Sequence, residues 1–139
     1  MRAMDDGVAY CQGMPASDPR WQKEQERVKR TLAIDFDGVL HAYGQGWQDG
    51  TIYDEPLPGA VDACRYLVDQ GFDLVIFTAR QDQAAIHKWL RTHGFPEMDV
   101  TNMKPPALFY IDDRAIRFRD WEDCLLKLSL HLQMGAREP

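Results

Sequence analysis

Short apolar runs that end in polar residues alternate along this chain with segments of helical pattern. The runs are TLAI at 31–34, LVIF at 74–77 and ALFYI at 107–111. Strands that are apolar throughout are typical of a parallel sheet that is covered on both faces. Their alternation with helices predicts an α/β fold, a Rossmann-like three-layer sandwich with a central, mainly parallel sheet.

The remaining pattern supplies the expected elements of this sandwich. Helices are expected at 21–30, 58–71, 82–94 and 120–132, and strands at 31–35, 72–80, 98–102 and 106–113. In the third of these helices, Ile86, Trp89 and Leu90 have the i, i+3, i+4 spacing of a buried helix face. This spacing predicts that the helix packs against the sheet.

The C-terminal part of the chain is expected to complete the fold. Asp120 stands where it can cap the helix at 120–132, and this amphipathic helix is expected to close the structure. The stretch RAIRFR at 114–119 alternates arginine with apolar residues. It is predicted to be a short strand with Ile116 and Phe118 pointing inward and the arginines pointing outward.

Length and charge limit what the chain can be. Its 139 residues fit one domain, with an N-terminal arm and short helix at 1–30 and the folded domain at 31–139. The formal net charge of −6 argues against generic binding to nucleic acid or to an anionic membrane. No apolar run approaches the roughly 20 residues of a membrane span, so a cytoplasmic protein is expected. Cys11, Cys64 and Cys124 are widely spaced and are expected to be reduced thiols.

Polar side chains gather where the predicted strands end. They are Asp35 and Asp37 after the first strand, Thr78 and Arg80 after the second, and Asp112 and Asp113 after the last, which Lys104 precedes. Ligands bind outside the carboxyl ends of the strands in such sheets, so these side chains are expected to lie together. Four carboxylates in one cleft repel one another and demand a counter-cation. Mg²⁺ fits best because it takes oxygen ligands and shares them with phosphate, and no histidine adjoins these acids to favour zinc.

This set of side chains suits the chemistry of phosphate esters. Asp35 is placed to attack phosphorus, and Asp37 to protonate the leaving oxygen and later to activate water. Mg²⁺ and a lysine would offset the charge of the phosphate, while a hydroxyl and backbone N–H groups would hold its oxygens. The predicted phosphate contacts are Thr78, Ala79, Arg80 and Lys104. Arg80 is open to a second interpretation as a surface ion pair.

The motifs DFDGV, FTAR, a lysine before an apolar strand, and YIDD, in that order, resemble the haloacid dehalogenase (HAD) superfamily of phosphohydrolases over residues 31–121. The resemblance implies that Asp35 forms an aspartyl-phosphate and that Asp37 is the general acid/base. It implies that Mg²⁺ is held by Asp35, the backbone carbonyl of Asp37, and Asp113, with Asp112 in support. The implied catalytic residues are Asp35, Asp37, Thr78 and Lys104. Residues 31–139 would then be one HAD-like catalytic domain.

The order of the motifs argues against two similar kinds of site. Response-regulator receiver domains also combine acids, a threonine and a lysine, but their acidic pair comes first and their lysine last. The second acid, Asp37, argues against the members that cleave carbon–halogen bonds, which have no leaving oxygen to protonate. Two functions stay open: a Mg²⁺-dependent phosphatase that acts through Asp35, and a non-catalytic or regulatory domain that binds a phosphorylated ligand on the same scaffold.

Access to the site is expected to be open. Residues 38–58 are too few for an inserted cap domain and are expected to form a hairpin-like flap with His41, Tyr43 and Trp47. The family resemblance implies that members without a cap accept bulky phosphates or borrow a lid from a partner subunit. The expected partner is therefore a phosphorylated substrate such as a nucleotide, a sugar phosphate or a macromolecular phosphate. A monomer and an oligomer both stay open.

Overall fold

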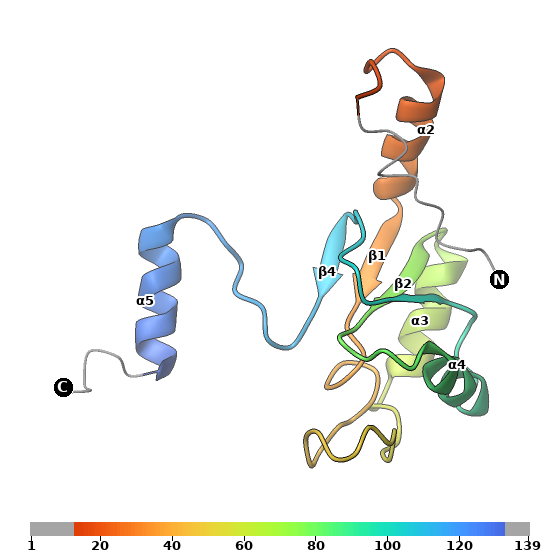
Figure 1. Cartoon of the computed structure of the whole chain (residues 1–139), viewed down its shortest axis with the longest axis vertical. Coiled ribbons are helices and arrows are strands. Elements are labelled where there is room, and N and C mark those ends of the chain that lie inside the picture. Colours follow the sequence, from red (N-terminus) through yellow and green to blue (C-terminus); the bar gives the residue numbers. More distant parts are fainter. Residues whose placement is uncertain (1–12, 133–139) are drawn as a thin grey trace.

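A four-stranded, wholly parallel sheet forms the centre of the chain (Figure 1). The structure is a computed structural model and describes residues 13–132. Its helices are α2 (Pro19–Val28), α3 (Ala60–Asp69), α4 (Gln83–Thr92) and α5 (Trp121–Leu132). Its strands are β1 (Thr31–Ile34), β2 (Asp73–Phe77), β3 (Asp99–Thr101) and β4 (Phe109–Ile111). The predicted Rossmann-like α/β sandwich is confirmed.

The strands lie in the order β3-β2-β1-β4, so that β1 has a neighbour on each side. Ile34 at the end of β1 is in register with Ile76 of β2 and with Ile111 of β4. The carboxyl ends of these three strands therefore lie at one edge of the sheet. The residues that come next in sequence are brought together there, as expected for this class of fold.

One face of the sheet is covered by α3 and α4 and holds the core. The buried apolar cluster joins alternate residues of β1 and β2 to both helices. Its largest contributions from α4 are Ile86, Trp89 and Leu90, all buried, which confirms the face predicted for that helix. From α3, Cys64 is buried in the same cluster. Because α3 and α4 share this face, β1 and β2 are held firmly from one side.

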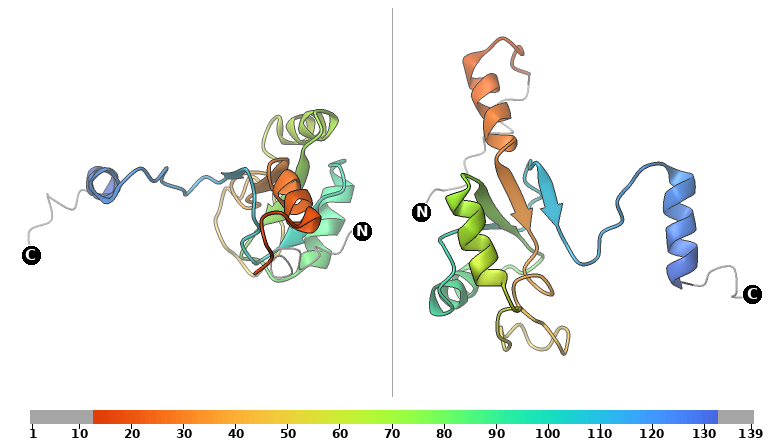
Figure 2. Two further views of the ribbon diagram at one scale, coloured as in Figure 1. Left: turned by 90° about the horizontal axis from the view of Figure 1, so that it is seen from above. Right: turned by 180° about the vertical axis from the view of Figure 1, so that it is seen from behind.

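The other face of the sheet is crossed by the connection at 102–108 (Figures 1 and 2). Leu108 N donates to Thr31 O at 2.8 Å, and the hydroxyl of Tyr110 donates to Pro105 O at 2.6 Å. Ala33, on this face of β1, is buried, and Pro105 in the connection is buried too. The connection at 102–108 thus covers this face of the sheet, as α3 and α4 cover the first face.

Side-chain caps explain where three of the helices begin. Asp18 accepts from Arg20 N at 2.8 Å before α2, and Asp82 accepts from Ala85 N at 3.0 Å before α4. Asp120 accepts from Asp123 N at 2.8 Å before α5, so the predicted cap of that helix is confirmed. Each carboxylate satisfies a backbone N–H that has no partner inside its helix.

The C-terminal segment departs from the sequence prediction. The stretch 114–119 is not a strand, and Ile116 and Phe118 are exposed. The α5 helix does not close the fold, because it stands apart from the sheet and buries no residue (Figures 1 and 2). The strand prediction was wrong because an alternating pattern shows only which side chains share a side of an extended segment. A strand also needs a neighbouring strand to bond with, and the pattern does not indicate one.

The terminal predictions are covered only in part. Of the expected N-terminal arm and short helix, α2 is present and has no buried residue, while residues 1–12 lie outside the described residues. Cys64 and Cys124 are free thiols, as expected, and Cys11 lies outside the described residues. Among residues 13–132, no helix has the length and apolar character to cross a membrane.

The buried centre of β2 should dominate stability. Ile76→Ala should lower the free energy of unfolding by about 2–5 kcal/mol, because Ile76 is fully buried and its removal leaves a cavity. Tyr66→Ala, on the exposed side of α3, should lower it by less than about 1 kcal/mol. Urea unfolding followed by circular dichroism measures both, and equal losses would contradict the core described above.

Candidate functional site

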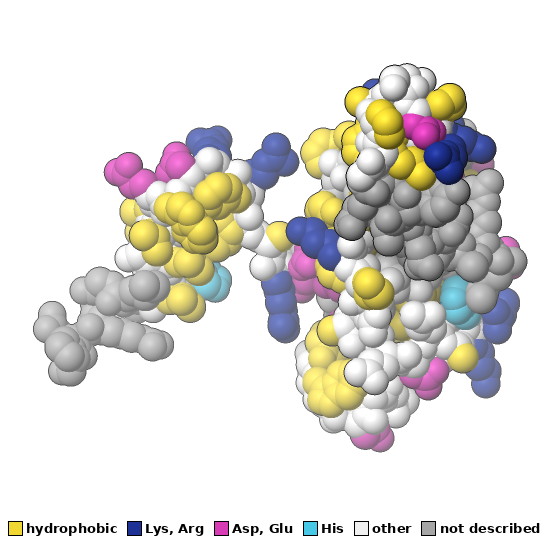
Figure 3. Space-filling model, turned by 45° about the horizontal axis from the view of Figure 1, so that its top comes forward, with side chains coloured by type: hydrophobic (Ala, Val, Ile, Leu, Met, Phe, Trp, Pro, Cys, Tyr) yellow, Lys and Arg dark blue, Asp and Glu magenta, His cyan; other side chains and the backbone are white. Residues whose placement is uncertain are grey.

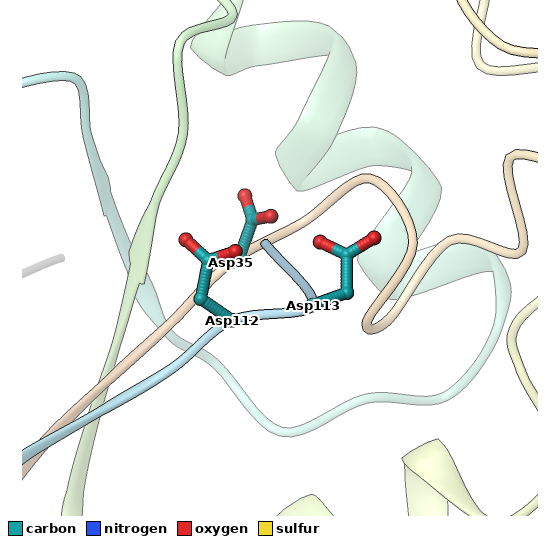
Figure 4. Close-up of side chains that lie close together, drawn as sticks. All are labelled: Asp35, Asp112 and Asp113. Carbon is teal, nitrogen blue, oxygen red and sulfur yellow. The ribbon is translucent and has the colours of Figure 1, made fainter. Parts of the chain in front are cut away.

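Three carboxylates converge where β1 and β4 end. Asp35 follows β1, and Asp112 and Asp113 follow β4 (Figure 4). One carboxylate oxygen from each of the three lies within 4.8 Å of the others. The backbone joins them as well, since Asp35 N donates to Ile111 O at 2.9 Å. The predicted meeting of these acids at one edge of the sheet is what the structure has.

Gly38 makes room for this cluster. Its φ of +83° is a left-handed conformation that favours glycine. A Cβ at this position would collide with the carboxylate of Asp113. The turn after β1 therefore favours glycine at this position of the DFDG motif, and any side chain there would displace the Asp113 carboxylate from its place beside the turn.

The environment of Asp35 disfavours its charged form. Partial burial is the largest cause that raises the pKa of this carboxyl, and together with the nearby charges of Asp112, Asp113 and Asp37 it brings the pKa to about 6. The backbone N–H of Phe36, which donates to Asp35 Oδ1 at 2.8 Å, acts in the opposite direction. A divalent cation among these oxygens would relieve the repulsion.

Asp37 has a different environment from the other three acids. Arg80 forms a two-pronged ion pair with it, from Nε to Oδ2 at 2.7 Å and from Nη2 to Oδ1 at 3.1 Å. The second partner is His41, whose Nδ1 lies 2.8 Å from Oδ1. Both carboxylate oxygens of Asp37 are thus occupied by chain donors, and its side chain is not part of the three-acid cluster.

His41 is a buried support for Asp37, a role that the sequence analysis missed. Its ring is fully buried, and its Nε2 accepts a hydrogen bond from Asp54 N at 3.0 Å. Because Nε2 accepts, the proton is on Nδ1, which donates to Asp37. The flap residue expected to cover the cleft instead lies beneath it. The short spacing between Asp37 and His41 was the only sequence signal for this pair.

A cavity of about 700 Å³ opens beside these groups. Its lining includes Asp35, Asp37, Thr78, Ala79 and Arg80, and also Tyr43, Trp47, Asp49 and Arg114. The flap at 38–58 returns on itself as expected, with Ala42 N bonded to Glu55 O at 3.0 Å and Leu57 N to Leu40 O at 2.8 Å. Trp47, at its tip, stacks over the Arg80 guanidinium at 5.1 Å.

The predicted phosphate contacts are only partly assembled. Thr78 and Ala79 line the cavity, and Thr78 Oγ1 accepts from Arg80 N at 3.1 Å. Lys104 does not line it, because its Nζ lies over the ring of Tyr110 at 4.7 Å. Arg114 does line it, although the sequence analysis placed its side chain outward. Arg80 is a cavity residue that pairs with Asp37 and is not a surface ion pair.

The donor set fits Mg²⁺. Asp35, Asp112 and Asp113 offer hard oxygen atoms at spacings that one cation can bridge, and no histidine or cysteine of residues 13–132 belongs to this cluster. The raised pKa of Asp35 also supports a cation site. Burial and the neighbouring carboxylates disfavour the negative charge of Asp35, and a bound cation would offset that charge. The structure places the side chain of Asp37 outside this set, so the metal role predicted for that residue rests on its backbone carbonyl.

Comparisons with known proteins bear on the fold alone. No protein-family model matches this sequence, and no curated protein matches it. Among solved structures, the chain is similar to a conserved protein from Bacteroides thetaiotaomicron, with 22% sequence identity and a TM-score of 0.50. That similarity covers 76% of this chain and 92% of the other. It supports an α/β architecture shared by the two proteins.

The raised pKa of Asp35 predicts that the free energy of unfolding depends on pH. Because its pKa rises from 3.8 to about 6 on folding, the folded chain holds this proton more tightly, and stability falls as pH rises from about 4 to about 6. Without metal at pH 7.5, Asp35→Asn should therefore raise the free energy of unfolding by up to about 2 kcal/mol, allowing for partial exposure.

Urea unfolding in EDTA at pH 7.5 and at pH 3.5 measures this effect. The gain should be absent at pH 3.5, where the native carboxyl is already neutral. Asp49→Asn is the matched control, because bonds from Thr51 lower the pKa of that exposed acid. A loss of stability in Asp35→Asn at pH 7.5 would contradict the repulsive environment.

Proposed function

We propose that this chain is a Mg²⁺-dependent phosphomonoester hydrolase of the HAD type that works through an aspartyl-phosphate on Asp35. The observation that carries the proposal is the meeting of three acids, Asp35, Asp112 and Asp113, of which Asp35 lines a cavity that Thr78 also lines. A cavity with a nucleophile, a cation site and a hydroxyl for phosphate oxygens suits phosphoryl transfer better than a purely structural acid cluster does.

Asp35, Asp112 and Asp113 would hold the cation. When bound, Mg²⁺ would supply positive charge that offsets the repulsion between a carboxylate and a phosphate dianion. Thr78 Oγ1 and backbone N–H groups between Thr78 and the start of α4 would bind the phosphoryl oxygens. Lys104 would contribute only after leaving the ring of Tyr110, because its Nζ rests there in the free chain.

The first step is an in-line displacement at phosphorus. A carboxylate oxygen of Asp35 forms a bond to phosphorus while the bond from phosphorus to the ester oxygen breaks. The leaving oxygen takes a proton from the carboxyl of Asp37, so the alcohol departs neutral. Asp35 is left as a mixed anhydride with phosphate, and Asp37 as a carboxylate.

The second step restores both acids. Asp37 accepts a proton from a water molecule as that water attacks phosphorus, and the bond from phosphorus to Asp35 breaks. Inorganic phosphate leaves, Asp35 is again a carboxylate and Asp37 again carries a proton. The open cavity supports hydrolysis over transfer to a selected acceptor, because water reaches the intermediate without passing a cap.

Asp37 must exchange partners to do this work. In the free chain Arg80 and His41 occupy both of its carboxylate oxygens. A phosphate dianion entering the cavity competes for the Arg80 guanidinium, which already stands in the cavity wall. Transfer of Arg80 to the substrate would free Asp37 to carry a proton, with His41 holding its orientation.

A domain that binds a phosphorylated ligand without turnover is the second candidate. The observation that favours it is that chain donors occupy both carboxylate oxygens of Asp37, while Lys104 lies over Tyr110 and does not line the cavity. The two candidates differ in one measurable respect. A panel of phosphomonoesters, from nucleotides and sugar phosphates to phosphorylated oligonucleotides, would release phosphate in the first case and only bind in the second.

Replacing the nucleophile should abolish turnover. Asp35→Asn should lower kcat by more than about a thousandfold, because an amide cannot form the covalent intermediate. Asp37→Asn should lower it by about 10²-fold to 10⁴-fold through loss of the general acid/base. Phosphate release from an aryl phosphate and from the panel measures both. Asp49→Asn, another acid of the cavity wall, is the matched control and should stay near the wild-type rate.

Retention of more than a few per cent of the wild-type rate in Asp35→Asn would overturn the covalent mechanism. Trapping provides a second readout that does not depend on rate. Beryllofluoride with Mg²⁺, a mimic of an acyl-phosphate, should bind to the wild-type chain and fail to bind to Asp35→Asn, as judged by ¹⁹F NMR.

Metal binding should depend on the same acids. Titration of the wild-type chain with Mg²⁺ in a calorimeter should give one site, weakened strongly in Asp113→Ala and less in Asp112→Ala. EDTA should remove activity and Mg²⁺ restore it, whereas Ca²⁺ should inhibit because its longer, looser coordination misplaces the phosphate. Full activity in EDTA would contradict a metal-dependent reaction and a metal-binding role for the three acids.

A further inference from the structure

Strand β4 carries apolar side chains that the described chain leaves uncovered. Phe109 and Ile111 are in register with Leu32 and Ile34 of β1, so they point to the same face of the sheet. Leu32 and Ile34 are 6% and 3% exposed, whereas Phe109 and Ile111 are 53% and 40% exposed. The core row of β1 thus continues onto β4, but the helix layer formed by α3 and α4 does not.

Helix α5 carries a matching apolar surface. Trp121, Leu125, Leu128 and Leu132 recur at i, i+4, i+7 and i+11 and form one stripe. Trp121 is 70% exposed and Leu125 54% exposed. Figure 3 shows hydrophobic side chains gathered over this helix, away from the main body. A helix of this composition in water is expected to pack against an apolar partner.

The segment that joins the two surfaces carries α5 away from β4 of its own chain (Figure 1). Between β4 and α5 the chain turns at residues 113–114 and then runs without a helix or strand, away from its own sheet (Figure 1). Its central part, RAIRFR at 114–119, contains none of the turn-forming residues Gly, Pro, Asn, Asp or Ser. For α5 to reach β4 of the same chain, this segment would have to turn back sharply. The sequence instead suits an extended arm.

We propose that two copies of this chain exchange their C-terminal arms, so that α5 of each copy packs on the Phe109 and Ile111 face of β4 in the other. A second copy supplies both missing partners at once, a helix for β4 and an apolar sheet face for α5. Exchange of an identical element is a low-cost route to a closed, twofold dimer. The arrangement is independent of the proposed hydrolase activity.

Further exposed apolar side chains in the connecting segment and on α5 agree with this arrangement. Ile116 and Phe118, exposed in the free arm, would lie beside the partner as the arm crosses to it. Leu126 and Leu130 lie on a second side of α5, so the helix is apolar on two sides. A helix buried between two copies is expected to have such a surface, whereas a helix on the outside of one copy is not.

Cross-linking of the wild-type chain tests the exchange directly. Lys127 lies on α5, and Lys104 lies against Tyr110 of β4. A lysine-reactive cross-linker is applied to an equal mixture of ¹⁵N-labelled and unlabelled chains that have been unfolded and refolded together. Exchange predicts Lys104–Lys127 peptides of mixed isotope content. Peptides of one isotope content only would show that α5 returns to its own sheet and would overturn the proposal.

The mass in solution gives a second outcome. Light scattering during gel filtration should give twice the chain mass of 16.0 kDa for the wild type. Phe109→Asp and Leu125→Asp should each shift the population to monomer, because a charge would enter the apolar contact. Tyr66→Asp, an exposed aromatic position on α3, is the matched control and should stay dimeric. A monomeric wild type at all concentrations, or dimers in both arm variants, would overturn the exchange.

Mixing the two variants separates exchange from any other dimer. Refolded together, the Phe109→Asp chain contributes an intact α5 and the Leu125→Asp chain an intact β4 face, so a mixed dimer keeps one wild-type contact. Native mass spectrometry should therefore show mixed dimers where each variant alone is monomeric. Two folded variants that stay monomeric in the mixture would contradict the reciprocal contact. The cross-linking experiment decides the matter if either variant does not fold.

Discussion

The pairing of β1 with a neighbour on each side is the constraint on which the rest of the structure depends. The hydrogen bond from Asp35 N to Ile111 O extends the ladder between β1 and β4 past the end of both strands. That extension holds Asp35 beside the two acids that come after β4, against their mutual repulsion. The backbone pairing of the sheet thus holds together three carboxylates that repel one another.

The acids of the site fall into two electrostatic classes. Asp35, Asp112 and Asp113 have one another for neighbours, so their charges call for a cation. Asp37 has a guanidinium and an imidazole N–H as partners, so its charge is already balanced within the chain. Residues two apart in the sequence therefore meet opposite conditions, because Asp35 lies beside other acids and Asp37 lies against Arg80 and His41.

Features that depend on local pattern and on the topology of parallel sheets could be predicted from the sequence. The strands, the buried face of α4, the Asp120 cap and the meeting of acids at one sheet edge all belong to this group. The roles of His41 and Arg114 and the position of Lys104 depend on how loops fold over the sheet, for which residue spacing gives no rule. The exposed α5 was missed because an amphipathic pattern shows that a helix needs a partner and not which chain provides it.

Trp89 connects the core to the site through ring contacts and the backbone of Asp54. Its ring packs edge-on against Phe36 and His41, and its indole N–H donates to Asp54 O at 3.1 Å, while the N–H of Asp54 holds His41. A small shift of α4 would thus reach the imidazole that orients Asp37. The packing of α4 and the orientation of Asp37 are therefore coupled. The tip of the flap is tied to the same acid through Arg80, which donates to Gly50 O at 2.8 Å and lies over the ring of Trp47.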